Sequence, residues 1–145
     1  MTTSALPPVP PPELGVSYRM TAPCAATTPK IVRDWLALLL IAFGHGDIAE
    51  QARLCASEVV TNAYRHTRTD RITVDVSLGA DAVTVWVNDD RPGWLPRVPR
   101  TLPSWEREGG RGLILLSRMA DGLHAGPNGA GGKRFAFSLA YKGAA

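Results

Sequence analysis

Two short runs of alternating apolar and polar residues constrain the fold of this 145-residue chain more than any other feature. In both runs an aliphatic side chain occupies every second position: Ile72, Val74, Val76 and Leu78, then Val83, Val85 and Val87. Such alternation is typical of strands that bury one face, and the short link of residues 79–81 predicts that the two strands form an antiparallel hairpin. The apolar face of this hairpin has to be covered by other elements of the chain.

A helical segment with a clear start and end precedes the hairpin. Thr28 is predicted to cap this helix, Pro29 to occupy its first position, and Gly44 to follow its last turn. The body of the helix, residues 30–43, is apolar on most sides, so we expect it to be largely buried.

The other expected elements complete a two-layer fold. Asp47 is predicted to cap a second helix, which continues to about His66. An edge strand, a third helix and a final pair of strands are expected at residues 14–18, 112–119, 122–125 and 133–141. Helices and strands in this order predict an α+β fold, a two-layer α/β sandwich with the helices on one face of a mixed, mostly antiparallel sheet.

Prolines gather in two segments that do not fit this regular pattern. Residues 1–13 contain five prolines and are predicted to be a disordered tail, ahead of a domain that spans residues 14–145. A ligand for an SH3-type domain is the alternative interpretation of this tail. Residues 91–109 carry proline at a density that blocks helices and central strands, which predicts a long irregular loop.

The composition argues against several classes of protein. No apolar run approaches the roughly 18 residues that a membrane-spanning helix needs, and the start of the chain does not resemble a signal peptide. Cys24 and Cys55 form neither a disulfide framework nor a four-ligand zinc site. A net charge of +3 without a basic run is weak evidence for nucleic-acid binding. We therefore expect a cytoplasmic protein without direct contact to membranes or nucleic acid.

Three polar residues line one face of the second predicted helix. Glu58, Asn62 and His66 are spaced four residues apart, so their directions drift by only about 80° in total. This stripe suits a hydrated Mg²⁺ beside phosphates, with Asn62 as a neutral oxygen ligand and Glu58 as a proton acceptor. The apolar residues of the helix are expected to pack elsewhere: Leu54, Val59, Val60 and Ala63. The alternative is the solvated polar face of an ordinary amphipathic helix.

Three further segments carry residues suited to nucleotide binding. Asp89, at the end of the second hairpin strand, can accept a hydrogen bond from an exocyclic amine, although aspartate is also a common turn former. Residues 109–112 (Gly-Gly-Arg-Gly) precede a helix whose first N–H groups favour phosphate, with a plain tight turn as the alternative. Lys133 opens the last strand and either reaches a phosphate or is solvated on a surface hairpin.

Together these segments resemble the GHKL (Bergerat-fold) family, which includes histidine-kinase catalytic domains and gyrase-type ATPases. Residues 58–66 match the N box of that family, E-x-x-x-N-A-x-x-H, and residues 87–93 resemble its G1 box, D-x-G-x-G. Residues 110–113 resemble its G2 box, and residues 132–133 resemble its last glycine-containing turn. The resemblance covers about residues 15–141. The form of the N box in so short a chain is similar to that of actinobacterial anti-sigma-factor serine/threonine kinases.

The resemblance implies ATP and Mg²⁺ as cofactors and a role for each matching residue. Glu58 would be the catalytic base, and Asn62 the Mg²⁺ ligand. Asp89 would recognise the adenine amino group, and Gly93 would lie under the adenine ring. The remaining nucleotide contacts would come from Gly110, Arg111, Gly112 and Leu113, with support from His66 and Lys133. Residues 91–108 would form the lid over the nucleotide.

The implied function is that of an ATP-binding regulatory protein. It would be an anti-sigma factor that sequesters a sigma factor and phosphorylates a serine of an anti-anti-sigma protein, and the resemblance also implies a homodimer. Two residues depart from the family pattern: Arg91 replaces the first glycine of the G1 box, and Arg134 stands where threonine is usual. They leave two alternatives open, a non-catalytic ATP-binding module that captures a partner and a relative that has lost nucleotide binding.

Overall fold

The two alternating runs form the central hairpin of a sheet. They are β2 (Arg71–Leu78) and β3 (Ala82–Asp89), which pair antiparallel as the pattern predicts. The Gly79 N–H closes the hairpin by donating to the Ala82 carbonyl at 2.9 Å. The computed structural model describes residues 15–66, 70–89, 115–127 and 133–142.

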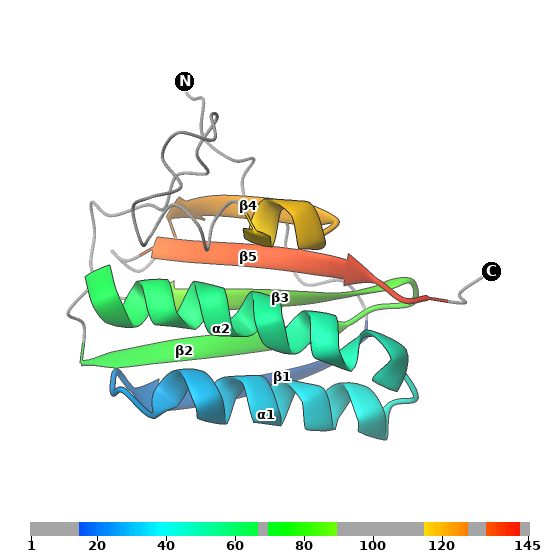
Figure 1. The fold of residues 1–145 in the computed structure, drawn as a ribbon, viewed down its shortest axis with the longest axis horizontal. Coiled ribbons are helices and arrows are strands. Elements are labelled where there is room, and N and C mark those ends of the chain that lie inside the picture. The colour runs from blue at the N-terminus through cyan, green and yellow to red at the C-terminus, as the bar shows by residue number, and fades with distance from the viewer. Residues whose placement is uncertain (1–14, 67–69, 90–114, 128–132, 143–145) are drawn as a thin grey trace.

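Three more strands extend the hairpin into a five-stranded sheet with the order β1-β2-β3-β5-β4 (Figure 1). The edges are β1 (Val16–Pro23) and β4 (Gly122–Pro127), and β5 (Lys133–Ala140) lies between β3 and β4. Every pairing among the described strands is antiparallel, where the sequence predicted a mixed, mostly antiparallel sheet. The predicted fold class, an α+β sandwich, is confirmed.

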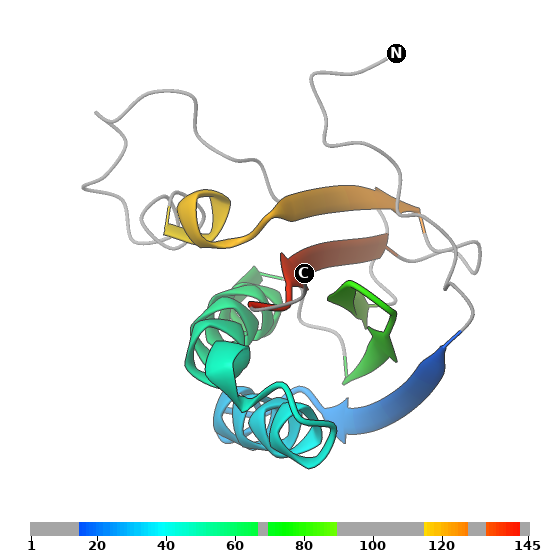
Figure 2. The same ribbon diagram turned by 90° about the vertical axis from the view of Figure 1, so that its right-hand side faces the viewer.

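Both long helices cover the same face of this sheet (Figure 2). They are α1 (Thr28–Ala42) and α2 (Ala49–His66), and the 3₁₀ turn η1 (Gly46–Ile48) joins them. The helix-facing side chains of the strands and the inner faces of the helices form one core. Its fully buried members include Val32, Leu36, Leu40, Val60, Val74, Val85 and Phe137.

The edge strand β1 is longer than the sequence predicted. All eight of its residues pair with β2, whereas the expected strand covered only residues 14–18. The added part of β1 carries polar cross-strand pairs on the face away from the helices. Arg19 forms an ion pair with Asp75, and the Thr21 hydroxyl lies 3.5 Å from that of Thr73. Such pairs stabilise a strand without contributing to an apolar pattern.

The start of α1 differs from the prediction by one residue. Thr27, rather than Thr28, is the N-cap residue, and no side-chain hydrogen bond among the described residues caps the helix. The Thr28 hydroxyl instead donates to the Pro23 carbonyl at 2.5 Å and accepts from the Ala25 N–H at 3.3 Å. The predicted end is confirmed, because Gly44 follows the helix with a φ of +83°, a conformation that favours glycine.

Two other predictions about the helices are wrong. Asp47 lies within η1 and therefore does not cap α2, which begins at Ala49. The largely apolar α1 is buried on one side only, since Ile31, Leu38 and Ile41 are exposed. The helix layer is a single helix deep, so the side of α1 that faces away from the sheet is not covered by another described element (Figure 2).

Several predicted features lie outside the described residues. They are the proline-rich tail 1–13, the irregular loop 91–109 and the first residues of the helix expected at 112–119. Residues 115–119 of that helix are described and are helical. The domain boundary at residue 14 stays a prediction. No helix in the described part of the chain is long and apolar enough to cross a membrane.

The position of the core generates a direct stability test. Phe137→Ala is expected to lower the free energy of unfolding by about 3–5 kcal/mol, because it removes a fully buried ring and leaves a cavity. Leu38→Ala, at a position on α1 that is 65% exposed, should change it by less than about 0.5 kcal/mol. Urea unfolding of both variants measures the difference, and equal losses would contradict this assignment of the core.

Candidate functional site

The helix α2 carries three of the predicted site residues toward one end of the sheet. Glu58, Asn62 and His66 occupy its C-terminal half, and α2 packs on β3 and β5. Figure 1 shows the C-terminal end of α2 at the same end of the molecule as the last residue of β3 and the first residue of β5. A ligand at this end therefore has access to both layers of the sandwich.

Burial along α2 distinguishes the predicted metal ligand from an ordinary surface residue. Asn62 is only 8% exposed, and Glu58, one turn earlier, is half-buried. Burying a carboxamide costs free energy unless it has polar partners, so a solvated polar face does not describe Asn62. Leu54, expected to pack, is 45% exposed. The other apolar residues pack in the core as predicted: Val59, Val60 and Ala63.

The strand register brings together two predicted site residues from distant segments. Asp89, the last residue of β3, is the Cα partner of Lys133, the first residue of β5. Their positions continue the two rows that face the helices through Val87 and Phe135. The predicted adenine-reading residue and the predicted phosphate-binding lysine are thus neighbours at the end of the sheet that α2 reaches.

The remaining predicted site residues cannot be placed on this framework. Most of them lie outside the described residues: Gly93 of the G1 box, and Gly110, Arg111, Gly112 and Leu113 of the G2 box. Arg91 and the two glycines of the last turn, Gly131 and Gly132, lie outside them as well. The predicted lid, residues 91–108, lies outside them as well. His66 is the last residue of α2, and its backbone alone is described.

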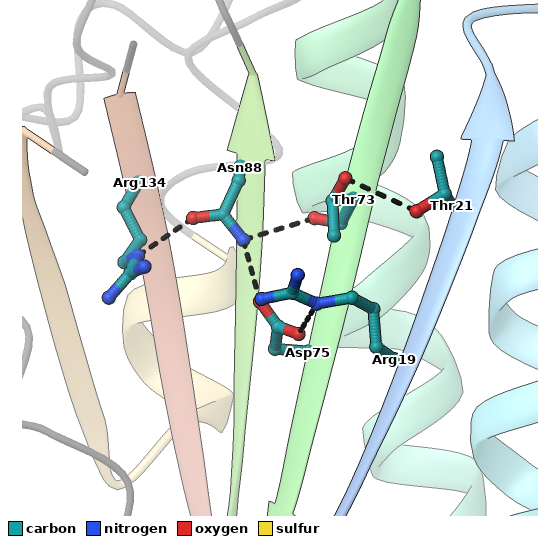
Figure 3. Close-up of polar contacts among 6 residues, drawn as sticks. All are labelled: Arg19, Thr21, Thr73, Asp75, Asn88 and Arg134. Atoms are coloured by element: carbon teal, nitrogen blue, oxygen red, sulfur yellow. Dashed lines mark hydrogen bonds and ion pairs between the residues drawn. The ribbon is translucent and has the colours of Figure 1, made fainter. Parts of the chain in front are cut away.

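The opposite face of the same strand ends holds a polar network that the sequence analysis missed (Figure 3). Arg134 Nε donates to Asn88 Oδ1 at 2.7 Å, and Asn88 Nδ2 donates to Asp75 Oδ2 at 3.0 Å and to the Thr73 carbonyl at 3.3 Å. Arg19 Nε then pairs with Asp75 Oδ1 at 2.6 Å. The network crosses four strands, in the order β5, β3, β2 and β1.

The alternation of the strands predicts the face on which the residues of this network lie, although not their partners. Asn88 precedes Asp89 by one residue and Arg134 follows Lys133 by one, so both belong to the face away from the helices. Asn88 and Arg134 are also Cα partners across β3 and β5. The departure from the family pattern at Arg134 therefore adds a cation to the outer face of the sheet and not to the end of the helix-facing rows.

The electrostatic balance of the network depends on Asp75. Its carboxylate accepts from both Arg19 and Asn88, and hydrogen bonding and Coulomb attraction by this carboxylate raise the pKa of Arg19. The Arg19 side chain is 67% exposed, so this ion pair by itself contributes little to stability. The half-buried Asn88, with charged partners on both sides, is the centre of the network.

The outer face also has a cavity of about 340 Å³ beside the network. Residues of β1, β2, β3 and β5 line it, among them Trp86, which is 3% exposed, and Arg134. The buried Trp86 Nε1 has no hydrogen-bond partner among the described residues. This cavity lies on the face opposite to the helices and is therefore separate from the predicted nucleotide site.

The donor set on α2 fits a magnesium ion that is held mainly by phosphates and water. No group of three or more His, Cys, Asp or Glu residues able to hold a metal occurs in the described part of the chain. A buried carboxamide oxygen with a carboxylate one turn away is instead compatible with Mg²⁺, which keeps several waters and takes its other ligands from phosphate oxygens.

Comparison with known families identifies a domain that spans most of the chain. The family model described as histidine kinase-like ATPase domain matches residues 22–133. This range includes all of α1 and α2, the central hairpin and the strand end at Lys133. Among curated proteins, no significant match to the chain is found.

The burial of Cys55 on α2 predicts a thiol that is inert in the folded chain. Desolvation, with smaller effects from Asp121 and Glu58, raises the pKa of Cys55 from 9.0 to about 12. Thiolate is the reactive form, so at pH 8 the folded chain should react about 1,000-fold more slowly than the unfolded chain. Because the folded-state pKa is the higher one, ionisation of this thiol favours unfolding between pH 9 and about 12.

A Cys24→Ser variant isolates Cys55 for this measurement with a thiol reagent, in buffer and in urea. Reaction in buffer at the rate seen in urea would show that the N-terminal half of α2 is not packed as described.

Proposed function

Because this chain belongs to the histidine kinase-like ATPase domain (GHKL) family, we propose that it binds Mg·ATP and phosphorylates a serine or threonine of a partner protein. The phosphoryl acceptor is an anti-anti-sigma protein, and the chain itself is an anti-sigma factor that sequesters a sigma factor. Family membership supports ATP as the ligand. Family membership alone does not imply the kinase activity, the magnesium ion or the partners, which are proposed in addition.

The burial of Asn62 is the observation that carries this proposal. The burial of this carboxamide, which is 8% exposed, costs free energy unless polar groups contact it, and the half-buried carboxylate of Glu58 lies one turn away. Its cost is offset when the two side chains face a polar ligand. The strand ends at Asp89 and Lys133 lie at the end of the sheet that α2 reaches, so a nucleotide there can contact both layers.

The chain's own residues perform two tasks in the proposed phosphoryl transfer. Glu58 orients the acceptor hydroxyl and takes its proton as the hydroxyl oxygen bonds to the γ-phosphorus. The bond between that phosphorus and the β,γ-bridging oxygen breaks, which leaves ADP and a phosphorylated partner. Asn62 holds Mg²⁺, which when bound neutralises charge on the phosphate oxygens.

The strand ends recognise the other parts of the nucleotide. Asp89 accepts a hydrogen bond from the adenine amino group, and Lys133 contributes a positive charge near the phosphates. These roles follow from the resemblance in sequence, and the register that makes the two residues neighbours supports them. The glycine-rich segment 110–113 supplies backbone N–H groups to the phosphates in the same proposal.

The proposed protein partners need an exposed surface, and α1 offers one. Ile31, Leu38 and Ile41 are exposed apolar side chains on the side of α1 that faces away from the sheet. Exposed apolar side chains that cluster on one face are typical of protein-binding surfaces. This surface supports binding of another protein chain, which the proposal takes to be a sigma factor or a second copy of this chain.

A non-catalytic module that captures a partner in its ATP-bound form is the second candidate. The replacement of the first G1 glycine by Arg91 favours it, because a bulky side chain there alters the approach to adenine. Arg134 does not favour it, since its guanidinium bonds to Asn88 on the outer face. A relative that has lost nucleotide binding is the remaining alternative.

Glu58→Gln separates these candidates. The variant is expected to keep the upward shift in Tm that Mg·ATP gives the wild-type chain, because the amide preserves shape and binding. Transfer of labelled phosphate to an anti-anti-sigma protein from the same genome should fall by a factor of about 10²–10⁴ with the loss of the proton acceptor.

Glu50→Gln provides a matched control on the same helix, at a glutamate that is 82% exposed, and should leave both readouts unchanged. Transfer at the wild-type rate by Glu58→Gln would refute the proposed base. Absence of transfer by the wild-type chain, with a clear shift in Tm, would favour the non-catalytic module. No shift in Tm at millimolar ATP would contradict both ATP-dependent candidates.

A further inference from the structure

The residue before Asp89 makes more contacts with neighbouring strands than a turn residue requires. Asn88 accepts from Arg134 Nε on β5 at 2.7 Å and donates to the Asp75 carboxylate on β2 at 3.0 Å. The same Nδ2 lies 3.3 Å from the Thr73 carbonyl, which belongs to the main chain of β2. One side chain on β3 thus ties β3 to both of its neighbours, β2 and β5, one residue before β3 ends (Figure 3).

We propose that Asn88 is a positioning residue for recognition of the nucleotide base, acting through Asp89. This inference rests on the proposed function, in which Asp89 reads the adenine amino group. Asn88 and its partners lie on the face of the sheet opposite to the proposed nucleotide, so they do not touch it. They hold the end of β3 in its register against β2 and β5.

The location of Asp89 explains why such a clamp matters. Asp89 is the last residue of β3, and its pair with Lys133 is the last pair between β3 and β5. Strand ends open at low free-energy cost, because no further ladder follows them. A hydrogen bond to an exocyclic amine needs a separation of about 2.7–3.2 Å, and misplacement by 1 Å removes most of its selectivity.

The chemistry of the network explains why an asparagine stands at this position. Its carboxamide oxygen faces the cation Arg134, and its nitrogen faces the carboxylate of Asp75. The two charged partners therefore fix the orientation of the amide. An aspartate at position 88 would repel Asp75, and a lysine would repel Arg134, so only a side chain with both an acceptor and a donor satisfies the two strands.

The same geometry gives a role to Arg134, which departs from the family pattern. Its guanidinium bonds to Asn88 directly across the β3–β5 pair, one residue after Lys133. Arg134 thereby joins the strand end that carries Lys133 to the strand end that carries Asp89. Arg134 therefore helps to keep Asp89 and Lys133 in register, and it is not itself a phosphate ligand.

The test compares ATP with purine riboside triphosphate, which lacks the 6-amino group, in the full-length chain. The wild-type chain is expected to bind ATP about tenfold or more tightly than this analogue. Asn88→Ala should abolish most of that preference, while binding of Mg·tripolyphosphate, which does not involve Asp89, should weaken much less. Thr84→Ala, on the same strand and the same outer face, is the matched control and should retain the full preference.

The outcomes distinguish this inference from the function on which it rests. A wild-type chain without a preference for ATP, or an Asp89→Ala variant that retains the preference, would refute base reading by Asp89 itself. A normal preference in Asn88→Ala, or equal weakening of ATP, the analogue and tripolyphosphate, would overturn the positioning role. If urea titrations show that Asn88→Ala is unfolded, Arg134→Met takes its place in the test. This variant removes one contact of Asn88 and should still reduce the preference for ATP.

Discussion

The packing of α2 on β3 and β5 is the interaction on which the candidate site depends. Val59, Val60 and Ala63 anchor the C-terminal half of α2 in the core, where the helix meets the apolar row of the sheet. Because these residues fix the rotation of the helix, Glu58 and Asn62 occupy set positions relative to the strands, and Asn62 becomes buried. Two polar residues of α2 and the strand ends at Asp89 and Lys133 are thus held on one rigid frame.

The alternation of side chains along β3 and β5 places the predicted ligand-binding residues and the supporting network on opposite faces of the sheet. Asp89 and Lys133 continue the helix-facing rows, where the proposed nucleotide lies, while Asn88 and Arg134 belong to the outer face. Asp89 and Lys133 are therefore each next in sequence to a residue of the supporting network. If Asp89 reads the base as proposed, substitutions on the outer face change base recognition without contact with the ligand.

The predictable part of this molecule is the part that a strong local pattern specifies. Alternating aliphatic residues identified β2 and β3, and Gly44 marked the end of α1, because each pattern has one favoured backbone conformation. The helix starts were misplaced, since Thr27 and Thr28 suit the N-cap position of α1 equally well and Asp47 belongs to the turn η1. The length of β1 and the partners of Asn88 depend on contacts between residues far apart in sequence, which no local pattern contains.

The position of the nucleotide can be measured by mapping the changes in backbone amide shifts by NMR on addition of Mg·ADP. A nucleotide bound between α2 and the strand ends should give the largest changes in the C-terminal half of α2, from Glu58 to His66, and at Asp89 and Lys133. Small changes are expected on α1 and in the N-terminal half of β1. Changes confined to the outer-face cavity around Trp86, or to α1, would contradict a nucleotide site between α2 and the strand ends.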